Sequence, residues 1–299
     1  MSSVSRISGA FEACKERGEA AFVPFVVLGD PTPDVSLKIV EAIEPHADIL
    51  EVGIPFSDPL ADGPTIQAAN QRAFASGVNT DVAFDLISKV RSITDKPIVI
   101  LTYFNVVLNR RGNPATGVDR FFYDMRRSGA DGVIIADLPV EEVGFVAEAA
   151  RREGRDLVFL VSPLTSSDRA VRIMAHASGY LYLVSLLGVT GARDSLSRVV
   201  FECLKRLSSF KVLPVAVGFG ISKPEHVEAV ASAGADGVIV GSAIVDLVAR
   251  FREDVPTMLE RVASLARSLK AATKRPRGLP LSGNSAVEGR ASPTPSPKR

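Results

Sequence analysis

Eight short runs of valine, isoleucine and leucine recur along this chain at intervals of roughly 25–45 residues, and this spacing limits the possible folds more than any other feature. Most of the runs are apolar without alternation. Strands that are apolar on both faces are typical of parallel sheets covered by helices. We predict strands at Phe22–Leu28, Asp48–Gly53, Pro97–Tyr103, Asp131–Ala136, Asp156–Val161, Gly179–Val184, Val212–Val217 and Gly237–Gly241.

Stretches of helical period lie between the strands, and a partial repeat supports this alternation. The segment SGADGVIIAD (Ser128–Asp137) resembles AGADGVIVGS (Ala233–Ser242), and each copy reads as a helix end, a glycine turn and a buried strand. Eight strand–helix units in about 250 residues are typical of a (β/α)8 TIM barrel. An open doubly wound sheet is the alternative, but the glycine fingerprint expected after its first strand is absent. We predict helices at Asp81–Ile93, Val118–Ser128, Val140–Glu153, Ser195–Leu207 and Pro224–Ala233.

The chain of 299 residues divides into one α/β domain and a tail. We place a single-domain (β/α)8 barrel with a short N-terminal helix at residues 1–273, and a disordered basic tail rich in proline and serine at residues 274–299. Residues 275–299 hold five basic residues and one acidic residue, while the formal net charge of the whole chain is only +1. The barrel is therefore slightly acidic.

Composition excludes several classes of protein. The near-neutral charge gives no reason to expect nucleic acid or an acidic membrane as partner. No apolar run approaches the ~18 residues of a membrane helix, and the N-terminus lacks the apolar core of a signal peptide. The two cysteines, Cys14 and Cys203, lie in unrelated segments and fit buried thiols of a reducing compartment, so we expect a cytoplasmic protein.

Glu51 is the strongest candidate for acid–base chemistry, because catalytic groups of a barrel lie at the carboxyl ends of its strands. Alternation places Glu51 with Ile49 on one face of its strand, and Leu50 with Val52 on the other. The apolar pair suits the helix-facing side, so Glu51 should point into the barrel. Desolvation there would raise its pKa and make it a proton shuttle near neutral pH. A structural glutamate paired with a distant base is the alternative.

The loop after this strand contains two further carboxylates, Asp58 and Asp62, among prolines and glycines that stiffen it. A long loop after a barrel strand is often functional, although each aspartate alone is typical of a turn.

The last three strands end in glycines that could hold an anion. The residues concerned are Gly188 and Gly191, Gly218 and Gly220, and Gly241 with Ser242. Backbone N–H groups at glycines and helix N-termini bind phosphate, and the last two loops of this barrel are its usual phosphate site; tight turns are the alternative. The spacing Ser222-Lys223-Pro224-Glu225 further predicts a capping box at a helix start.

Absences narrow the chemistry. No lysine follows a strand, which argues against a Schiff-base aldolase, and the three histidines lie on helices or before strands, so we predict no metal. The residues alone therefore predict a barrel enzyme that acts on a phosphorylated small molecule by carboxylate acid–base chemistry. Its pocket would have aromatic walls formed by Phe25, Tyr103, Tyr182 and Phe219.

The segment LEVGIPFSDPLADGPTIQ (Leu50–Gln67) strongly resembles the signature of the tryptophan synthase alpha chain family. Five further motifs match that family in the same order, and the similarity covers roughly residues 11–269. They are FVPFVVLGDP (Phe22–Pro31), ADLPVEE (Ala136–Glu142), GVTGAR (Gly188–Arg193), VGFGIS (Val217–Ser222) and VGSAIV (Val240–Val245).

The resemblance implies a carbon–carbon lyase of tryptophan biosynthesis. Such an enzyme cleaves indole-3-glycerol phosphate to indole and glyceraldehyde 3-phosphate by a retro-aldol reaction and passes indole to a beta subunit. Glu51 matches the residue that moves the protons, and Asp62 matches the residue that hydrogen-bonds the indole N–H. By the same resemblance, the substrate-binding residues are Phe25, Leu101, Tyr103, Ile134, Tyr182, Gly191, Phe219, Gly220, Gly241 and Ser242.

The resemblance also implies a partner, since the family works with a beta subunit that carries pyridoxal phosphate. It implies an alpha2beta2 complex and no cofactor in this chain, with Asp58, Pro59 and Asn105 at the contact. Three features depart from the family. Val27 replaces a threonine, Leu186 replaces an arginine or another polar residue, and the segment 106–119 is longer than usual and lacks a proline after Asn105.

Two other functions are alternatives. A sugar-phosphate isomerase or epimerase would usually need metal ligands at the strand ends, which the sequence lacks. A catalytically weak subunit that mainly activates the beta chain is the second, and the intact pair of Glu51 and Asp62 argues against it.

Overall fold

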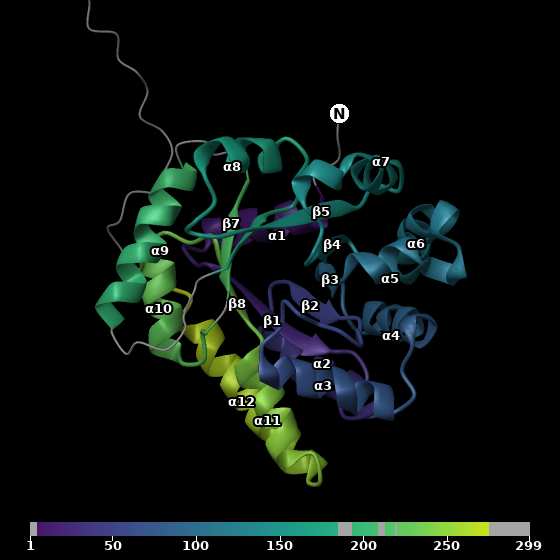
Figure 1. The fold of residues 1–299 in the computed structure, drawn as a ribbon. Coiled ribbons are helices and arrows are strands. Elements are labelled where there is room, and N and C mark those ends of the chain that lie inside the picture. The colour runs from purple at the N-terminus through teal and green to yellow at the C-terminus, as the bar shows by residue number, and fades with distance from the viewer. Residues whose placement is uncertain (1–4, 185–192, 209–212, 219, 275–299) are drawn as a thin grey trace, which may run out of the picture.

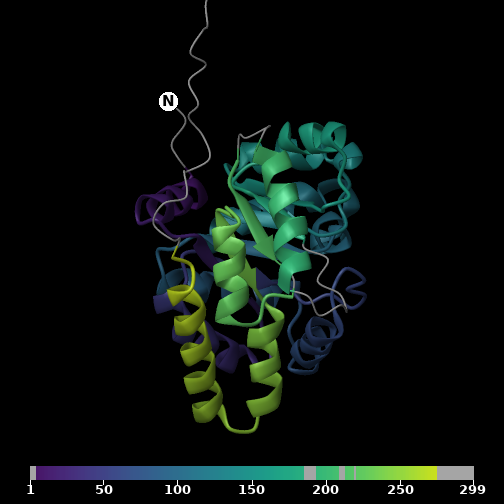
Figure 2. The ribbon, with the colours of Figure 1, turned by 90° about the vertical axis from the view of Figure 1, so that its left-hand side faces the viewer.

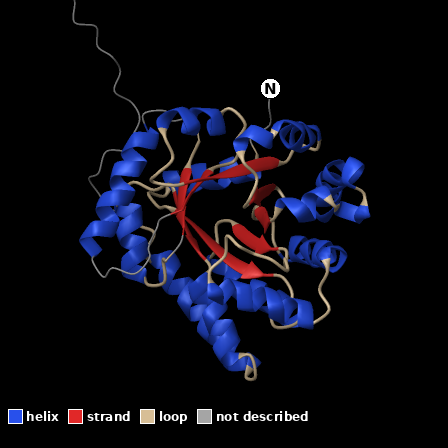
Figure 3. Ribbon diagram, in the orientation of Figure 1, coloured by secondary structure: helices blue, strands red, loops and turns tan. Residues whose placement is uncertain are grey.

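The computed structural model describes residues 5–184, 193–208, 213–218 and 220–274. Within them, eight parallel strands close into a barrel in the order of the chain, with helices around it (Figures 1 and 3). The predicted TIM barrel is confirmed, and each predicted strand is present with small shifts at its ends. The strands are β1 (Ala21–Val27), β2 (Leu50–Gly53), β3 (Ile98–Thr102), β4 (Gly132–Ile135), β5 (Asp156–Val161), β6 (Leu181–Val184), β7 (Val215–Gly218) and β8 (Gly237–Val240).

The helices between the strands follow the predicted apolar periodicity. The α-helices are α1 (Arg6–Glu16), α2 (Pro33–Ile43), α3 (Pro64–Ala75), α4 (Thr80–Ile93), α5 (Phe104–Leu108), α6 (Pro114–Ser128), α7 (Gly144–Arg152), α8 (Ser167–Met174), α9 (Arg193–Ser208), α10 (Pro224–Ser232), α11 (Ser242–Phe251) and α12 (Val255–Ala271). Short 3-10 helices are η1 (Glu44–His46), η2 (Arg110–Gly112) and η3 (Val140–Glu142). In the described part of the chain, no helix has both the length and the apolar character needed to cross a membrane.

Side chains that alternate along each strand belong to two apolar layers. Leu50 and Val52 lie in the outer layer, between the strands and the helices. Ile49 lies in the inner layer, and parallel pairing of Glu51 with Phe25 and Val99 sets these three residues at one level. The predicted inward direction of Glu51 follows from this alternation.

Helix α1 closes the amino-terminal end of the barrel, which confirms the predicted N-terminal helix. Ile7, Phe11 and Cys14 of this helix are buried in the inner layer. The ring of Phe11 packs against Tyr180, with 5.5 Å between the ring centroids. The interior is thus sealed at this end, and access is left to the carboxyl ends of the strands.

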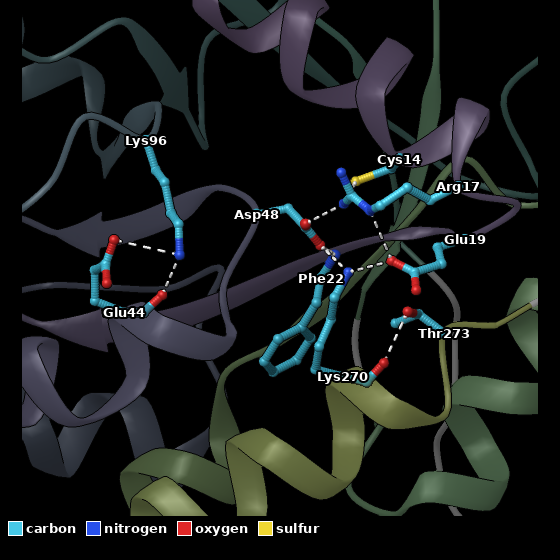
Figure 4. A network of polar contacts seen from close by, with 9 residues as sticks. All are labelled: Cys14, Arg17, Glu19, Phe22, Glu44, Asp48, Lys96, Lys270 and Thr273. Carbon is cyan, nitrogen blue, oxygen red and sulfur yellow. Dashed lines mark hydrogen bonds and ion pairs between the residues drawn. The ribbon is translucent and has the colours of Figure 1, made fainter.

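A network of charged side chains at the amino-terminal end of the barrel joins the segment before β1 to the end of α12 (Figure 4). The Nζ of Lys270 lies 2.6 Å from Asp48 Oδ2 and 3.0 Å from Glu19 Oε2. Asp48 also binds Arg17 and accepts a hydrogen bond from the Phe22 N–H. These contacts attach α12, which runs back beside α11 (Figure 2), to the start of β1 and β2.

Three details differ from the sequence prediction or extend it. The helix predicted at 140–153 is divided into η3 and α7. The predicted capping box is wrong, because Lys223 is the N-cap residue of α10 and Ser222 lies outside it, with its N–H directed to His226 Nδ1. Lys274 forms an isolated antiparallel β-bridge with Glu19 through the backbone. The rest of the predicted tail lies outside the described residues.

Candidate active site

A cavity of about 230 Å³ opens at the carboxyl ends of the strands. Residues from β1, β2, β3, β6, β8, the loop before α3 and the start of α11 line it. Eight of the twelve predicted catalytic and substrate-binding residues are among them: Phe25, Glu51, Asp62, Leu101, Tyr182, Gly220, Gly241 and Ser242. The barrel topology therefore assembles most of the predicted site from segments that are distant in sequence.

Glu51 lies at the floor of this cavity and is only 1% exposed. Burial raises the pKa of its carboxyl group to about 8; the nearby Asp62 acts in the same direction and the Tyr180 hydroxyl acts against it. The Oε2 atom is enclosed without a hydrogen-bond partner within the described residues. A buried carboxyl group with a free oxygen and a near-neutral pKa can both donate and accept a proton.

Asp62 belongs to the loop between β2 and α3 and is half-buried. Its N–H donates to the Pro59 carbonyl at 3.0 Å, and its own carbonyl accepts from Gln67 Nε2 at 2.9 Å. Burial raises the pKa of the Asp62 carboxyl group to about 6, and the Tyr103 hydroxyl limits this rise. At neutral pH Asp62 is therefore mostly ionised while Glu51 is mostly protonated.

This difference gives the two carboxyl groups different chemistry. A protonated acid in an apolar environment and an ionised carboxylate in a more polar one form an acid–base pair with separate roles. Glu51 can transfer protons, and Asp62 can accept a hydrogen bond from a group that becomes positively charged.

The walls of the cavity are mostly apolar and suit a flat ring. Phe25, Leu101, Ile66, Ile221 and Ile239 contribute side chains to it. Position 53 requires glycine for packing, because a Cβ there would stand 2.8 Å from the Phe25 ring.

The rim of the cavity next to β8 is suited to an anion. Gly241 and Ser242 line it where α11 begins, and Gly241 provides no side-chain cap for the helix. The first N–H groups of a helix carry partial positive charge and lack partners within the helix. Since no lysine or arginine is among the described residues that line the cavity, the donors available at this rim are backbone N–H groups and the Ser242 hydroxyl.

The other four predicted substrate residues lie elsewhere. Tyr103 is buried behind Asp62, where its hydroxyl accepts from the Ala61 N–H at 3.1 Å. Ile134 is fully buried in the inner layer and does not line the cavity. Gly191 and Phe219 lie outside the described residues, as does Leu186.

Sequence reasoning missed Tyr180, whose buried hydroxyl lies beside Glu51 and acts to lower the pKa of that carboxyl group. A signal was present, because Tyr180 precedes Tyr182 by two residues and so shares its inward face. Sequence reasoning also missed Ile239 of β8, which lines the cavity and precedes the predicted Gly241 by two residues.

The predicted partner residues lie at the same end of the barrel. Asp58 is exposed, Pro59 is buried, and Asn105 is exposed at the start of α5. Beside them, Leu60 is 92% exposed.

Two of the three departures from the family have a structural setting. Val27 is buried with Ala69, Ala73 and Val245, so its contact with α3 is apolar. The long segment 106–119 is folded into α5, η2 and the start of α6, and the buried Arg110 anchors it to Asp124.

The described part of the structure gives no sign of a metal site. Within it, no three histidine, cysteine, aspartate or glutamate side chains come together as a metal would require.

Comparison with known proteins identifies the family of this chain. The family model described as tryptophan synthase alpha chain matches residues 11–274. The tryptophan synthase alpha chain of Methanoregula boonei is 49% identical over 246 residues, which cover 82% of this chain and 89% of that protein.

Solved structures of the same family share the fold. Tryptophan synthase subunit alpha of Legionella pneumophila is 33% identical, with a TM-score of 0.81 over 90% of this chain and 98% of that chain. A chain in the tryptophan synthase a2b2 complex of Pyrococcus furiosus is 37% identical, with a TM-score of 0.77 over 85% of this chain and 99% of that chain.

Proposed function

Because this chain belongs to the tryptophan synthase alpha chain family, we propose that it cleaves indole-3-glycerol phosphate to indole and glyceraldehyde 3-phosphate. It is the alpha subunit of tryptophan synthase and has a lyase role in tryptophan biosynthesis. The observation that carries the proposed reaction is the pair of carboxyl groups in one cavity, one with a pKa of about 8 and one with a pKa of about 6.

The reaction needs two proton transfers. Glu51 in its acid form donates a proton to C3 of the indole ring, which places positive charge on the ring nitrogen. Ionised Asp62 accepts a hydrogen bond from the indole N–H and stabilises this charge. Glu51, now a carboxylate, takes the proton from the glycerol hydroxyl next to C3. The carbon–carbon bond breaks as the aldehyde forms, and its electrons return to the ring to restore neutral indole.

The cavity supports binding of such a substrate. The indole ring would lie between Phe25 and Leu101, with the phosphate at the N–H groups of Gly241 and Ser242. Because the described lining residues include no cation, we assign the dianion to these local dipoles and to the Ser242 hydroxyl. The same lining includes no lysine, which supports a reaction without a Schiff base.

The beta subunit is the partner that this proposal includes. The structural relative from Pyrococcus furiosus is part of an a2b2 complex, and we extend that stoichiometry to this chain. Apolar side chains follow the carboxyl ends of successive strands. Leu60 after β2 and Leu164 after β5 are 92% and 83% exposed. Between them, the rings of Phe104 and Phe145 pack with 6.1 Å between their centroids. Such a group of apolar side chains at one end of the barrel suits a partner surface. Pyridoxal phosphate would belong to the beta subunit, and both subunits would act in the cytoplasm.

Indole release from indole-3-glycerol phosphate tests the proposed reaction. The full chain is assayed with and without a tryptophan synthase beta subunit, in parallel with Glu51→Gln and with Glu228→Gln, an exposed control on α10. We expect Glu51→Gln to abolish indole release and Glu228→Gln to preserve it. Beta-subunit activation without indole at any concentration would instead identify a weak subunit that acts mainly as an activator.

A further inference from the structure

The loop of residues 54–63 carries Asp62 but contains no helix or strand. Its outer residues Ser57, Asp58 and Leu60 are exposed, so few apolar contacts hold it from that side. A catalytic carboxylate on such a loop needs support from neighbouring elements, because small displacements of a reacting group reduce the rate strongly.

Asn70 supplies the first support, from α3. Its side chain is 4% exposed, its Nδ2 donates to the Ile66 carbonyl at 3.1 Å, and its Oδ1 accepts from the Phe56 N–H at 3.3 Å. The opposite orientation of the amide would place a donor against the Phe56 N–H. The two bonds therefore fix the amide and attach the start of the loop to the helix.

Phe56 and Tyr103 continue this chain of contacts to Asp62. Their rings are stacked, with 4.8 Å between centroids and 24° between planes. The Tyr103 hydroxyl accepts from the Ala61 N–H at 3.1 Å, so its own proton is available to the neighbouring Asp62 carboxylate. One tyrosine thus contacts both the backbone and the catalytic group of the loop.

We infer that Asn70, Phe56 and Tyr103 are positioning residues, which hold the loop so that Asp62 faces the substrate in its ionised form. This inference rests on the proposed function for the role of Asp62, but the contacts themselves do not. Tyr103 is then a support behind the site, whereas the family resemblance implied a residue that binds substrate. Asn70 has no role in that resemblance.

The pH dependence of kcat/KM separates this role from general stability. The titratable groups around Asp62 are Glu51, Tyr103 and Tyr182. The Tyr103 hydroxyl stabilises the ionised form of Asp62, so its loss in Tyr103→Phe raises the pKa of Asp62. We expect the acid limb of kcat/KM to move up by about one pH unit. The basic limb should stay in place.

Variants at Asn70 test the other end of the chain of contacts. Asn70→Leu removes the acceptor for the Phe56 N–H and should lower kcat about tenfold, while Asn70→Asp retains an acceptor and should recover most of the activity. In Asn70→Leu/Tyr103→Phe the losses should be smaller than the product of the single effects, because both residues act through one loop.

The control is Ser76→Ala on the same helix. Its hydroxyl donates to the Gly29 and Ala73 carbonyls and does not contact the loop. If Tyr103→Phe leaves the acid limb unchanged, or if Asn70→Leu loses no more activity than Ser76→Ala at an equal folded fraction, the inference is wrong.

Limited proteolysis of the full chain gives a readout that needs no activity. Chymotrypsin should cleave after the exposed Leu60 faster in Asn70→Leu and Tyr103→Phe than in wild type or Ser76→Ala. Equal cleavage rates in all four proteins would overturn the positioning role. Absence of indole from a wild-type chain with a protected loop would instead contradict the proposed function alone.

Discussion

The Tyr182 hydroxyl lies against Gly218, in the space that a Cβ at position 218 would occupy. Tyr182 lines the cavity, and its contact with β7 holds the ring in place beside Glu51 and Asp62. The cavity therefore keeps its shape only if position 218 has no side chain. This steric requirement is separate from any role of Gly218 in binding an anion.

Gly218→Ala should displace Tyr182 and lower kcat/KM by about 10- to 100-fold. Steady-state indole formation measures the effect. Gly9→Ala is the matched control, because no atom lies within 4 Å of a Cβ at position 9 in α1. A Gly218→Ala enzyme as active as Gly9→Ala would contradict the steric relationship.

The pH profile of kcat/KM should be bell-shaped, with limbs near pH 6 and pH 8. Below the lower limb Asp62 becomes protonated and can no longer stabilise the charged ring. Above the upper limb Glu51 is ionised and has no proton to donate. Initial rates in buffers of constant ionic strength test this, and a wild-type rate that does not fall above pH 8 would contradict the role of Glu51.

Lys270→Met should destabilise the fold by about 2 kcal/mol, because it leaves the carboxylates of Asp48 and Glu19 with less cationic support. Urea unfolding at neutral pH measures the effect, with Lys38→Met, an exposed lysine of α2, as control.

The same network predicts the direction of its pH dependence. Burial acts to raise the pKa of Glu19, but Lys270 and Arg17 outweigh it and lower the pKa below the ordinary value. The contribution of Glu19 is therefore present above that ordinary value and is lost as the pH falls through the lowered one. The difference between wild type and Lys270→Met should shrink in acid, and a difference that grows there would contradict the assignment.

Arg110→Met should cost about 3 kcal/mol, because Arg110 is buried and its removal leaves Asp124 without its main partner. The guanidinium also lies 4.8 Å from the centre of the Phe84 ring. Arg111→Met is the control: Arg111 and its partner Asp81 are each 52% exposed, and exposed pairs contribute about 0–1 kcal/mol. Thermal denaturation compares the two, and equal losses would show that Arg110 does not anchor the segment.

Local patterns were sufficient for predictions that depend on one segment. The inward direction of Glu51 follows from alternation within β2, and the number of strands follows from apolar runs that exclude water on both faces. The capping box at Ser222 failed although its spacing was correct, because Pro224 moved the start of the helix by one position relative to the motif.

Contacts between distant segments were beyond such patterns. The sequence does not distinguish Asn70 from other polar residues of a helix, because its partner, the Phe56 N–H, reaches its Oδ1 only through the fold. Likewise, nothing in the sequence around Tyr180 indicates a polar neighbour, and only the fold places Glu51 of β2 beside its hydroxyl.

The amino-acid sequence by itself determined the barrel, the inward face of each strand and the carboxyl groups that end β2 and its loop, because periodicity and solvent exclusion act along the chain. Only the tertiary structure decided which groups surround those carboxyls: Tyr180 at Glu51, Tyr103 at Asp62, and Gly218 beneath Tyr182. The physical reason is that pKa values and close packing depend on distances through space, which the closure of eight strands sets all at once.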